Sequence, residues 1–335
     1  MVGEQGVGAG RLALRFLFVL LVLALAGLAA VGWVYSRFIA PGPLDMPRVV
    51  VVPKGAGLIG VGETLMRHGV IDNADIFKLG VRALKLGHRL KAGEYQFPAR
   101  ISPRDAAWIL ESGKTVVRRL TVAEGLTTHQ VLGHVNAAEG LEGALAVSPG
   151  EGTLLPETYH FSYGDERAEI LRRMKDAMDK TLAELWANRA SDLPFKTPQE
   201  ALILASIVEK ETGLAAERPR IAGVFVNRLR KGMKLQSDPT VIYGVNNGAG
   251  PMDRQISRAD LKQPTPYNTY AIDGLPPGPI CNPGRDAIAA VLRPSATEEL
   301  YFVADGTGGH VFARSLDEHN RNVARWRKIE KERQE

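Results

Sequence analysis

The sequence predicts an α+β protein with a single N-terminal transmembrane helix, a small α/β subdomain and a larger domain of mixed helices and strands. Three observations support this class. An uncharged apolar run of 20 residues lies near the N-terminus, strand and helix patterns then alternate over about 75 residues, and several helical patterns and a late hairpin pattern occupy the remainder. The chain has 335 residues, of which 45% are hydrophobic, so it contains enough apolar material for more than one core.

The same observations divide the chain into segments. The predicted segments are 1–15, a cytoplasmic N-terminus; 16–36, the transmembrane helix; 37–47, a linker; 48–122, the small subdomain; and 123–335, the larger domain.

Composition and cysteine content argue against several classes of function. The net charge is +5, but the basic residues are spread along the chain and are balanced by 37 acidic residues, so no nucleic-acid partner is expected. Cys281 is the single cysteine, which excludes an intrachain disulfide, and we expect it to be a packed small residue. No CxxC or HExxH spacing occurs, so we expect neither a metal site nor a cofactor.

The apolar run Phe16–Tyr35 matches the roughly 20 residues that a helix needs to cross a bilayer. A cleaved signal peptide is the alternative, and the small residues Gly27–Ala29 offer a cleavage site. The run is longer than the roughly 7–15 apolar residues of a signal peptide, and Trp33 and Tyr35 suit a membrane interface. We therefore favour a retained membrane anchor.

The charges beside this run indicate its orientation only in part. Arg11 and Arg15 precede it and favour a cytoplasmic N-terminus, whereas Arg37 and Arg48 follow it and weaken that signal. The charges therefore only suggest a single-pass protein with a cytoplasmic N-terminus, whose remaining chain lies outside. The Pro/Gly-rich stretch Ile39–Pro47 is predicted to be a spacer.

The small subdomain alternates short strands and helices. The predicted order is a strand in "RVVVVP", a helix in "GVGETLMRHGVI" that stops at Gly69, a helix in "IFKLGVRALKLG", a strand in "AGEYQFP", a helix in "SPRDAAWILESG" and a strand in Thr115–Val122. Ser102 is predicted to cap the last of these helices, with Pro103 in its first turn and Gly113 just after its end. The unit is too short for a doubly wound sheet.

The larger domain begins near Glu124 with helical segments and contains one apolar helix, "LILASIVEKETG". Its start is marked by a capping box in which Thr197 is the N-cap, Pro198 follows it and Glu200 is the third helical residue. Gly213 is predicted to end the helix in the left-handed conformation. Because the helix is apolar nearly all round, we expect protein to surround it.

The rest of the domain is predicted from turn and cap signals. "RPRIAGVFVNRLRKG" forms an amphipathic helix that ends at Gly232, and Asn282 caps a later helix. Between them, Val245–Gly284 is rich in Gly, Pro, Asn and Tyr, which is typical of a functional loop. A hairpin around "GTGG" and a charged helix capped by "SLDE" complete the prediction.

The buried helix ends in two acids, Glu209 and Glu211, which point in different directions. Burial and the negative end of the helix dipole both disfavour a carboxylate, so whichever acid is buried is expected to have a raised pKa. A carboxylic acid that stays protonated near neutral pH suits general acid catalysis on a glycosidic oxygen. The structural alternative is an ion pair with Arg218, Arg220 or Arg228. Spacing alone leaves the choice between the two acids open.

The segments after this helix contain aromatic and amide side chains that suit sugar rings. The candidate substrate contacts are Gln236, Asp238, Tyr243, Tyr267 and Asn268, together with Tyr270. Each of them could instead pack a loop, and Asp238 could be a helix N-cap before Pro239. His310 follows a glycine turn and is predicted to be a hairpin residue rather than a base.

Five blocks carry a resemblance to a known family. The blocks "ILASIVEKETG", "VFVNRL", "LQSDPTVIYG", "YNTYAIDGLPPGPICNPG" and "YFVADGTGGHVF" resemble those of the YceG-like family of endolytic murein transglycosylases, in order and within a match from about Val49 to Asn322. The resemblance implies that 48–122 is a LysM-like subdomain and that 123–335 is a YceG-like catalytic domain. It also implies that Glu209, the first acid of "VEKET", is catalytic and that Glu211 has a supporting role.

The resemblance further implies a substrate and partners. The expected reaction is cleavage of nascent peptidoglycan strands between MurNAc and GlcNAc, which leaves 1,6-anhydroMurNAc ends and terminates strand elongation. The resemblance also implies a single-pass protein of the cytoplasmic (inner) membrane with its catalytic domain outside, on the periplasmic side. The expected partners are glycan strands, the cytoplasmic membrane and peptidoglycan synthases.

Two other functions remain open at this stage. A glycoside hydrolase would need a second carboxylate roughly 5–9.5 Å from the acid, with Asp238, Glu157 or Asp253 as candidates. A membrane-anchored wall-binding protein without enzymatic activity would use Glu209 only structurally. Product chemistry separates the hydrolase from the transglycosylase, and turnover separates both from the binding protein.

Overall fold

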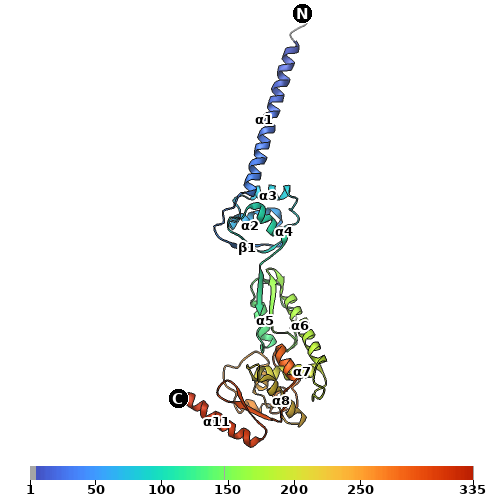
Figure 1. Ribbon diagram of the computed structural model, residues 1–335, viewed down its shortest axis with the longest axis vertical. Coiled ribbons are helices and arrows are strands. Elements are labelled where there is room, and N and C mark those ends of the chain that lie inside the picture. Colours follow the sequence, from blue (N-terminus) through green and yellow to red (C-terminus); the bar gives the residue numbers. More distant parts are fainter. Residues whose placement is uncertain (1–4, 147, 335) are drawn as a thin grey trace. The chain divides into compact units, whose positions relative to one another are not determined.

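The computed structural model describes residues 5–146 and 148–334, and the chain folds as two compact units that are described separately here (Figure 1). The first unit runs to Arg118 and includes Ser162–Gly164, while the second contains Arg119–Phe161 and the chain from Asp165 onward. Helices and strands are mixed in the described chain, as predicted. The division falls within a strand, four residues before the predicted boundary at 122.

The first unit contains one long helix and a small α/β body. Its elements are α1 (Gln5–Ile39), β1 (Arg48–Val52), α2 (Gly57–Arg67), α3 (Ala74–Ala83), β2 (Gly93–Phe97) and α4 (Pro103–Ser112). The part of α1 from Leu12 to Ile39 is long and apolar enough to cross a membrane. Ser102 caps α4 by accepting the Asp105 N–H at 3.1 Å, and Gly113 follows the helix at φ 71°, so both predicted signals are confirmed.

The core of this unit reaches into the segment predicted to be a spacer. β1 pairs antiparallel with β2, and side chains such as Tyr95 and Phe77 are fully buried beside them. Phe38 and Leu44 belong to the same core, with exposed fractions of 3% and 4%. Phe38 lies so close to α3 that a Cβ on Gly80 would stand 2.4 Å from its ring. The chain that follows the apolar run is therefore packed on the unit.

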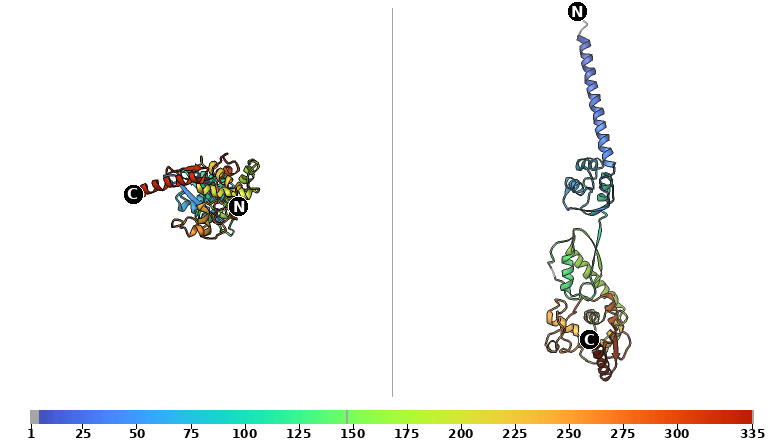
Figure 2. Two further views of the ribbon diagram at one scale, coloured as in Figure 1. Left: turned by 90° about the horizontal axis from the view of Figure 1, so that it is seen from below. Right: turned by 90° about the vertical axis from the view of Figure 1, so that its left-hand side faces the viewer.

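The second unit is mostly helical with short two-stranded pairings. Its elements, starting with the strand at the boundary, are β3 (Val117–Thr121), α5 (Thr128–Ala137), β4 (Leu141–Glu142), β5 (Thr158–Ser162), β6 (Asp165–Glu166), α6 (Arg167–Ala187), α7 (Pro198–Glu211), α8 (Arg218–Arg230), α9 (Asp238–Asn246), η1 (Asp260–Lys262), α10 (Arg285–Leu292), β7 (Tyr301–Ala304), β8 (His310–Ala313) and α11 (Leu316–Gln334). β3 pairs with β5, β4 pairs in parallel with β6, and β7 forms the predicted antiparallel hairpin with β8. The red helix α11 extends from the body of this unit (Figure 2).

Helix α7 lies at the centre of the second unit. Every residue from Ala201 to Val208 is buried, and α7 contacts α6, α8, α9 and α10. The capping box is present, since the Thr197 side chain accepts the Glu200 N–H while the Glu200 side chain accepts the Thr197 N–H. The prediction of a helix surrounded by protein is confirmed, because only such surroundings bury apolar side chains on every face.

Three predicted helix ends are wrong. Gly213 is not left-handed, because α7 stops at Glu211 and Thr212 continues in extended conformation with φ −143°. The Thr212 hydroxyl then accepts the Leu214 N–H at 3.0 Å, so a threonine side chain rather than a glycine makes this turn.

The other two errors concern N-caps. Asn282 does not cap α10, whose N-cap is Gly284, because the Asn282 side chain instead accepts the Leu154 N–H at 2.9 Å. Asp238 is the first residue of α9, and Ser237 is its N-cap. In both places the side chain that local sequence assigns to a cap accepts from a distant group instead, the Leu154 N–H for Asn282 and the Tyr270 hydroxyl for Asp238.

Candidate active site

The last turn of α7 sends three successive side chains into three different surroundings. Successive residues of a helix are about 100° apart, so Glu209, Lys210 and Glu211 cannot share one face. Glu209 faces the start of α10 and Arg218, Lys210 lies at a cavity, and Glu211 faces the start of α9. The polar end of the buried helix thus meets specific partners in each direction.

The Glu209 carboxylate has two hydrogen-bond donors. Its Oε1 accepts from Arg218 Nη2 at 3.2 Å, and its Oε2 accepts the backbone N–H of Gly284 at 2.8 Å. Gly284 is the N-cap of α10, so this oxygen lies at the positive end of a helix dipole. The Glu209 side chain is 4% exposed. The ion pair considered from the sequence therefore exists, and Arg218 is the arginine that makes it.

Arg218 is shared by two further carboxylates. Its Nη2 lies 3.1 Å from Glu124 Oε2, and its Nη1 lies 3.7 Å from Asp286 Oδ2. Three acids thus surround one guanidinium, which cannot neutralise them all. Burial raises the pKa of Glu209, and the negative charges of Glu124 and Asp286 raise it further. The Gly284 N–H and Arg218 oppose this shift. The net direction is upward, as predicted for a buried acid at this helix end.

Glu211 has a different environment. It accepts a hydrogen bond from the Ser237 hydroxyl. Burial raises its pKa from 4.5 to about 7, Ser237 opposes this shift, and the charge of Asp238 reinforces it. Both acids therefore have the raised pKa that the sequence predicts, and this property does not choose between them.

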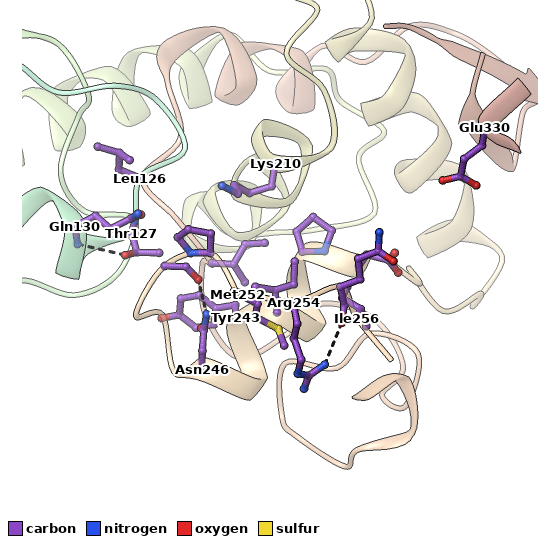
Figure 3. A pocket seen from close by; sticks show the side chains of 17 residues that line it. Leu126, Thr127, Gln130, Lys210, Tyr243, Asn246, Met252, Arg254, Ile256 and Glu330 are labelled. Atoms are coloured by element: carbon purple, nitrogen blue, oxygen red, sulfur yellow. Dashed lines mark hydrogen bonds between the residues drawn. The ribbon is translucent and has the colours of Figure 1, made fainter. Parts of the chain in front are cut away.

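A cavity of about 720 Å³ opens beside Lys210 (Figure 3). Its walls come from the start of α5, from one side of α9 and from the segment 250–256. Lys210 lies against it and donates from Nζ to the Gly125 carbonyl at 3.2 Å. Asp238 and Tyr243, two of the predicted substrate contacts, line this cavity.

The Glu209 carboxyl is not part of the wall of the cavity. In the described chain neither Glu209 nor Glu211 is among the residues that line the cavity. A Cβ on Gly125 would stand 3.6 Å from Glu209 Cγ, and Leu126, the next residue, lines the cavity. Glu209 is thus close to the chain at Gly125, one residue before the wall residue Leu126, and the Lys210 side chain packs on the same glycine.

The other three predicted contacts, Gln236, Tyr267 and Asn268, are not among the described residues that line the cavity. The Tyr267 ring centroid is 4.7 Å from that of Tyr243. Gln236 adopts φ 50°, and its N–H donates to the Thr269 carbonyl at 3.2 Å. Asn268 is fully buried, and its amide holds the loop around η1 through the carbonyls of Leu261 at 3.0 Å and Gln263 at 2.8 Å.

The remaining candidates are also placed. Asp238 accepts the Tyr270 hydroxyl at 2.6 Å, whereas Glu157 and Asp253 are exposed. His310 begins β8, as predicted, and its Nδ1 lies 2.7 Å from Glu217 Oε2. Cys281 is buried. Within residues 5–146 and 148–334, no group of three or more His, Cys, Asp or Glu side chains is arranged to hold a metal ion.

Sequence reasoning missed two acids that shape the site, Glu124 and Glu151. Glu151 is a half-buried carboxyl whose pKa is raised by desolvation, and it accepts from the Thr128 N–H at 2.7 Å and from the Tyr243 hydroxyl at 3.2 Å. Each acid precedes a glycine, but that is a weak signal. Their roles depend on partners about 90 positions away, which no local pattern identifies.

Comparisons with known proteins agree on one family. The profile of the YceG-like family matches residues 50–325. The endolytic murein transglycosylase of Streptococcus pneumoniae serotype 2 (strain D39) is 30% identical over 361 residues, which cover 93% of this chain and 64% of that protein. The chain therefore spans less than two thirds of the length of this relative.

Two further comparisons concern part of a relative and a solved structure. The endolytic murein transglycosylase of Bacillus subtilis (strain 168) is 38% identical over 178 residues, which cover 52% of this chain and 47% of that protein. A crystal structure of a yceG-like protein from Listeria monocytogenes has 30% sequence identity and a TM-score of 0.52, and the match covers 82% of this chain and 98% of that one.

Proposed function

This chain belongs to the YceG-like family, and from that membership and the surroundings of Glu209 we propose that it is an endolytic lytic transglycosylase of peptidoglycan. Relatives in two organisms are named endolytic murein transglycosylases, which supports this reaction class. The proposed reaction cleaves nascent glycan strands between MurNAc and GlcNAc and leaves 1,6-anhydroMurNAc ends. Such cuts terminate strand elongation.

The observation that carries the proposal is the sharing of Arg218 by three carboxylates. Glu209 is the least exposed of them, with a side-chain exposure of 4% against 41% for Glu124 and 72% for Asp286. When one positive charge faces three acids, the acid with the least access to water is the one that holds a proton most readily. Glu209 is therefore the proposed general acid of this cluster, and its place as the first acid of the "VEKET" block favours it over Glu211, whose pKa is also raised.

The proton balance of the reaction needs only this one carboxyl. Glu209 first donates its proton to the glycosidic oxygen as the C1–O bond breaks, which releases GlcNAc as the leaving group. The oxygen of the MurNAc C6 hydroxyl then bonds to C1, and the Glu209 carboxylate takes the proton of that hydroxyl. No water is consumed, and Glu209 returns to its protonated state.

Two neighbours suit the carboxylate that exists between these steps. Arg218 Nη2 and the Gly284 N–H already donate to the two oxygens of Glu209, so the negative charge appears where donors are in place. They also limit how far the pKa of Glu209 is raised. A group that first donates a proton and then takes one back benefits from this balance, because a pKa far above the working pH would make it a poor acid and a pKa far below would make it a poor base.

We assign the glycan strand to the cavity beside Lys210. Its volume of about 720 Å³ lies within the range of roughly 300–1,000 Å³ that is usual for ligand sites. Tyr243 and Asp238 are the proposed sugar contacts in its wall, with Tyr267 and Gln236 next to them. Asn268 is assigned to holding the loop, because its amide is already bonded within the protein. The strand would approach Glu209 near Gly125, on which the Lys210 side chain packs.

The remaining parts of the proposal concern location and the first unit. Helix α1 would anchor the chain in the cytoplasmic membrane as a single-pass protein, with both units on the outer, periplasmic side. The first unit is proposed to be LysM-like on family grounds. Peptidoglycan synthases are the proposed protein partners, because they make the nascent strands on which this enzyme would act.

The decisive experiment is mass analysis of purified glycan strands digested by the full chain and by the Glu209→Gln variant. We expect new ends that are lighter by one water than a hydrolysed reducing end, and fragments that come from cuts inside the strands. MurNAc ends that borohydride reduces would instead identify a hydrolase. Binding of strands without turnover would identify a wall-binding protein, and release of terminal disaccharides alone would rule out endolytic cleavage.

A further inference from the structure

The first unit carries an apolar groove of about 410 Å³ where α1 meets α3. One wall comes from the C-terminal part of α1, with Val31 and Val34, and the other comes from α3 and the residue after it, with Leu79 and Leu84. Leu79 is 50% exposed and Leu84 is 40% exposed. The groove is thus an open apolar surface at one end of the membrane-spanning candidate.

The position of the groove along α1 suggests what fills it. The uncharged part of α1 between Arg15 and Arg37 is roughly 30 Å long at 1.5 Å per residue, which matches the hydrocarbon core of a bilayer. Val31 and Val34 lie in the last third of this stretch, beside Trp33 and Tyr35, which suit the membrane interface. Side chains that share a groove with Val31 and Val34 must lie at the same depth, so α3 meets the bilayer too.

The C-terminal end of α1 packs tightly against the rest of the first unit. The Phe38 side chain is 3% exposed in the core of the unit, against Gly80 of α3. Arg37 pairs with Asp72 at 3.1 Å, and the Gly42 N–H donates to the Ile101 carbonyl at 3.0 Å. A Cβ on Gly42 would stand 2.4 Å from that same carbonyl oxygen, which shows how closely the backbone segments approach. The unit is therefore held directly against the end of the helix.

Charges beside the groove suit the headgroup layer. Arg82 on α3 and Lys85 just after it are both exposed. The nearby acids Asp72 and Asp75 are paired with Arg37 and Lys78. Long basic side chains place their charge among phosphates while their stems cover apolar surface. An apolar groove with basic residues beside it is the pattern of a lipid-facing surface.

We propose that this groove holds acyl chains of phospholipids in the leaflet where α1 ends, with α3 lying in the membrane interface. The inference rests on the proposed membrane anchoring by α1 and goes beyond it. An anchor alone would leave the first unit free to lift from the surface. Acyl chains in the groove would instead hold it on the membrane and set the height at which the rest of the chain begins.

The test uses the full chain, one copy per lipid nanodisc, with single nitroxide labels in a Cys281→Ala background. Cys281 is buried and is the single cysteine, so engineered cysteines are the only labelled positions. The labels are placed at Leu84→Cys in the groove and at Leu23→Cys in the middle of α1. The matched control is Ile59→Cys, an apolar residue of α2 that is 55% exposed and does not line the groove. Accessibility to oxygen, which concentrates in lipid, is compared with accessibility to a water-soluble nickel chelate.

We expect the oxygen-to-nickel accessibility ratio at residue 84 to be several-fold higher than at residue 59 and to approach the ratio at residue 23. A lipid-exposed label at 23 together with an aqueous label at 84 would overturn the groove proposal and leave the anchor standing. An aqueous label at 23 would overturn both. A label at 84 that neither reagent reaches would show that protein covers the groove, and this result would also reject the lipid assignment.

Discussion

Each oxygen of the Glu209 carboxyl has its own donor, Arg218 for one and the Gly284 N–H for the other. Glu209→Gln keeps an acceptor for the Gly284 N–H and nearly the same volume, so the fold should persist. Turnover should fall by ~10² to 10⁴ or more, since the group that moves the proton in both steps is lost. The measurement is the rate of formation of anhydro ends, with thermal unfolding as the check on folding.

Glu211→Gln is the matched control for that variant, because Glu211 is two residues further along α7 and points in a different direction. It removes a carboxyl that contacts Ser237 rather than the Arg218 cluster, so we expect a smaller loss of turnover. If Glu211→Gln proves the more damaging change at equal stability, the general acid has been assigned to the wrong residue.

The charge cluster around Arg218 predicts a second effect at the residue scale. The negative charge of Glu124 raises the pKa of Glu209, so Glu124→Gln should lower that pKa. The alkaline limb of the pH profile of kcat/KM should then move to lower pH, because the acid loses its proton sooner. Asp286→Asn should move it less, since Asp286 is farther from Arg218 and 72% exposed. An unmoved limb in Glu124→Gln would show that this limb belongs to another group.

Glu211 predicts how stability depends on pH. Its pKa is raised from 4.5 to about 7, so between these values the folded state holds a proton that the unfolded chain has released. Stability from this group is complete below about pH 4.5 and is lost as pH rises through about 7. Glu211→Gln removes this loss, so its melting temperature should fall less than that of the unmodified chain between pH of about 4 and about 8. If the melting temperature fell equally in both proteins, the raised pKa of Glu211 would be contradicted.

At the scale of elements, the position of the site depends on helix α7. Its capping box joins Thr197 and Glu200, and eight consecutive buried residues follow them. Thr197→Ala leaves a helix N–H without its acceptor and should cost about 0.5–2 kcal/mol of unfolding free energy. Urea unfolding of the full chain measures this cost.

The control for this cap is Glu200→Gln, because a glutamine at this position of a capping box can still accept the N-cap N–H. It should cost less than Thr197→Ala. If the two variants are equally destabilised, the charge of Glu200, and not the reciprocal pair of hydrogen bonds, is what supports the helix start.

At the scale of the whole molecule, helix α1 predicts the location of the chain. Leu12–Ile39 is long and apolar enough to cross a membrane, and it carries no charge between Arg15 and Arg37. We expect the chain to stay with the membrane fraction and its residues beyond about Arg37 to lie outside. Protease added to spheroplasts should then degrade the soluble part while a cytoplasmic marker survives. Complete protection, or a mature protein that starts near Ala30, would contradict a retained anchor.

Local signals predicted most elements of the fold. Ser102 and Thr197 start helices where expected, because an N-cap depends on a side chain and backbone groups only two or three residues away. Gly213 and Asn282 were predicted by the same logic and are wrong. In the first case Thr212 makes the turn, and in the second a partner far along the chain uses the Asn282 side chain.

Three features could be predicted from the amino-acid order alone: an apolar run long enough for a membrane, a helix that protein must surround, and acids with a raised pKa at the end of that helix. Each depends on the pattern of residues that are close together in the sequence. The packing of distant segments was needed to show that Arg218 is shared by Glu124, Glu209 and Asp286, that Gly284 donates to Glu209, and that the cavity opens at Lys210. These contacts join residues up to 94 positions apart, and side chains so distant in sequence meet only when several helices pack together.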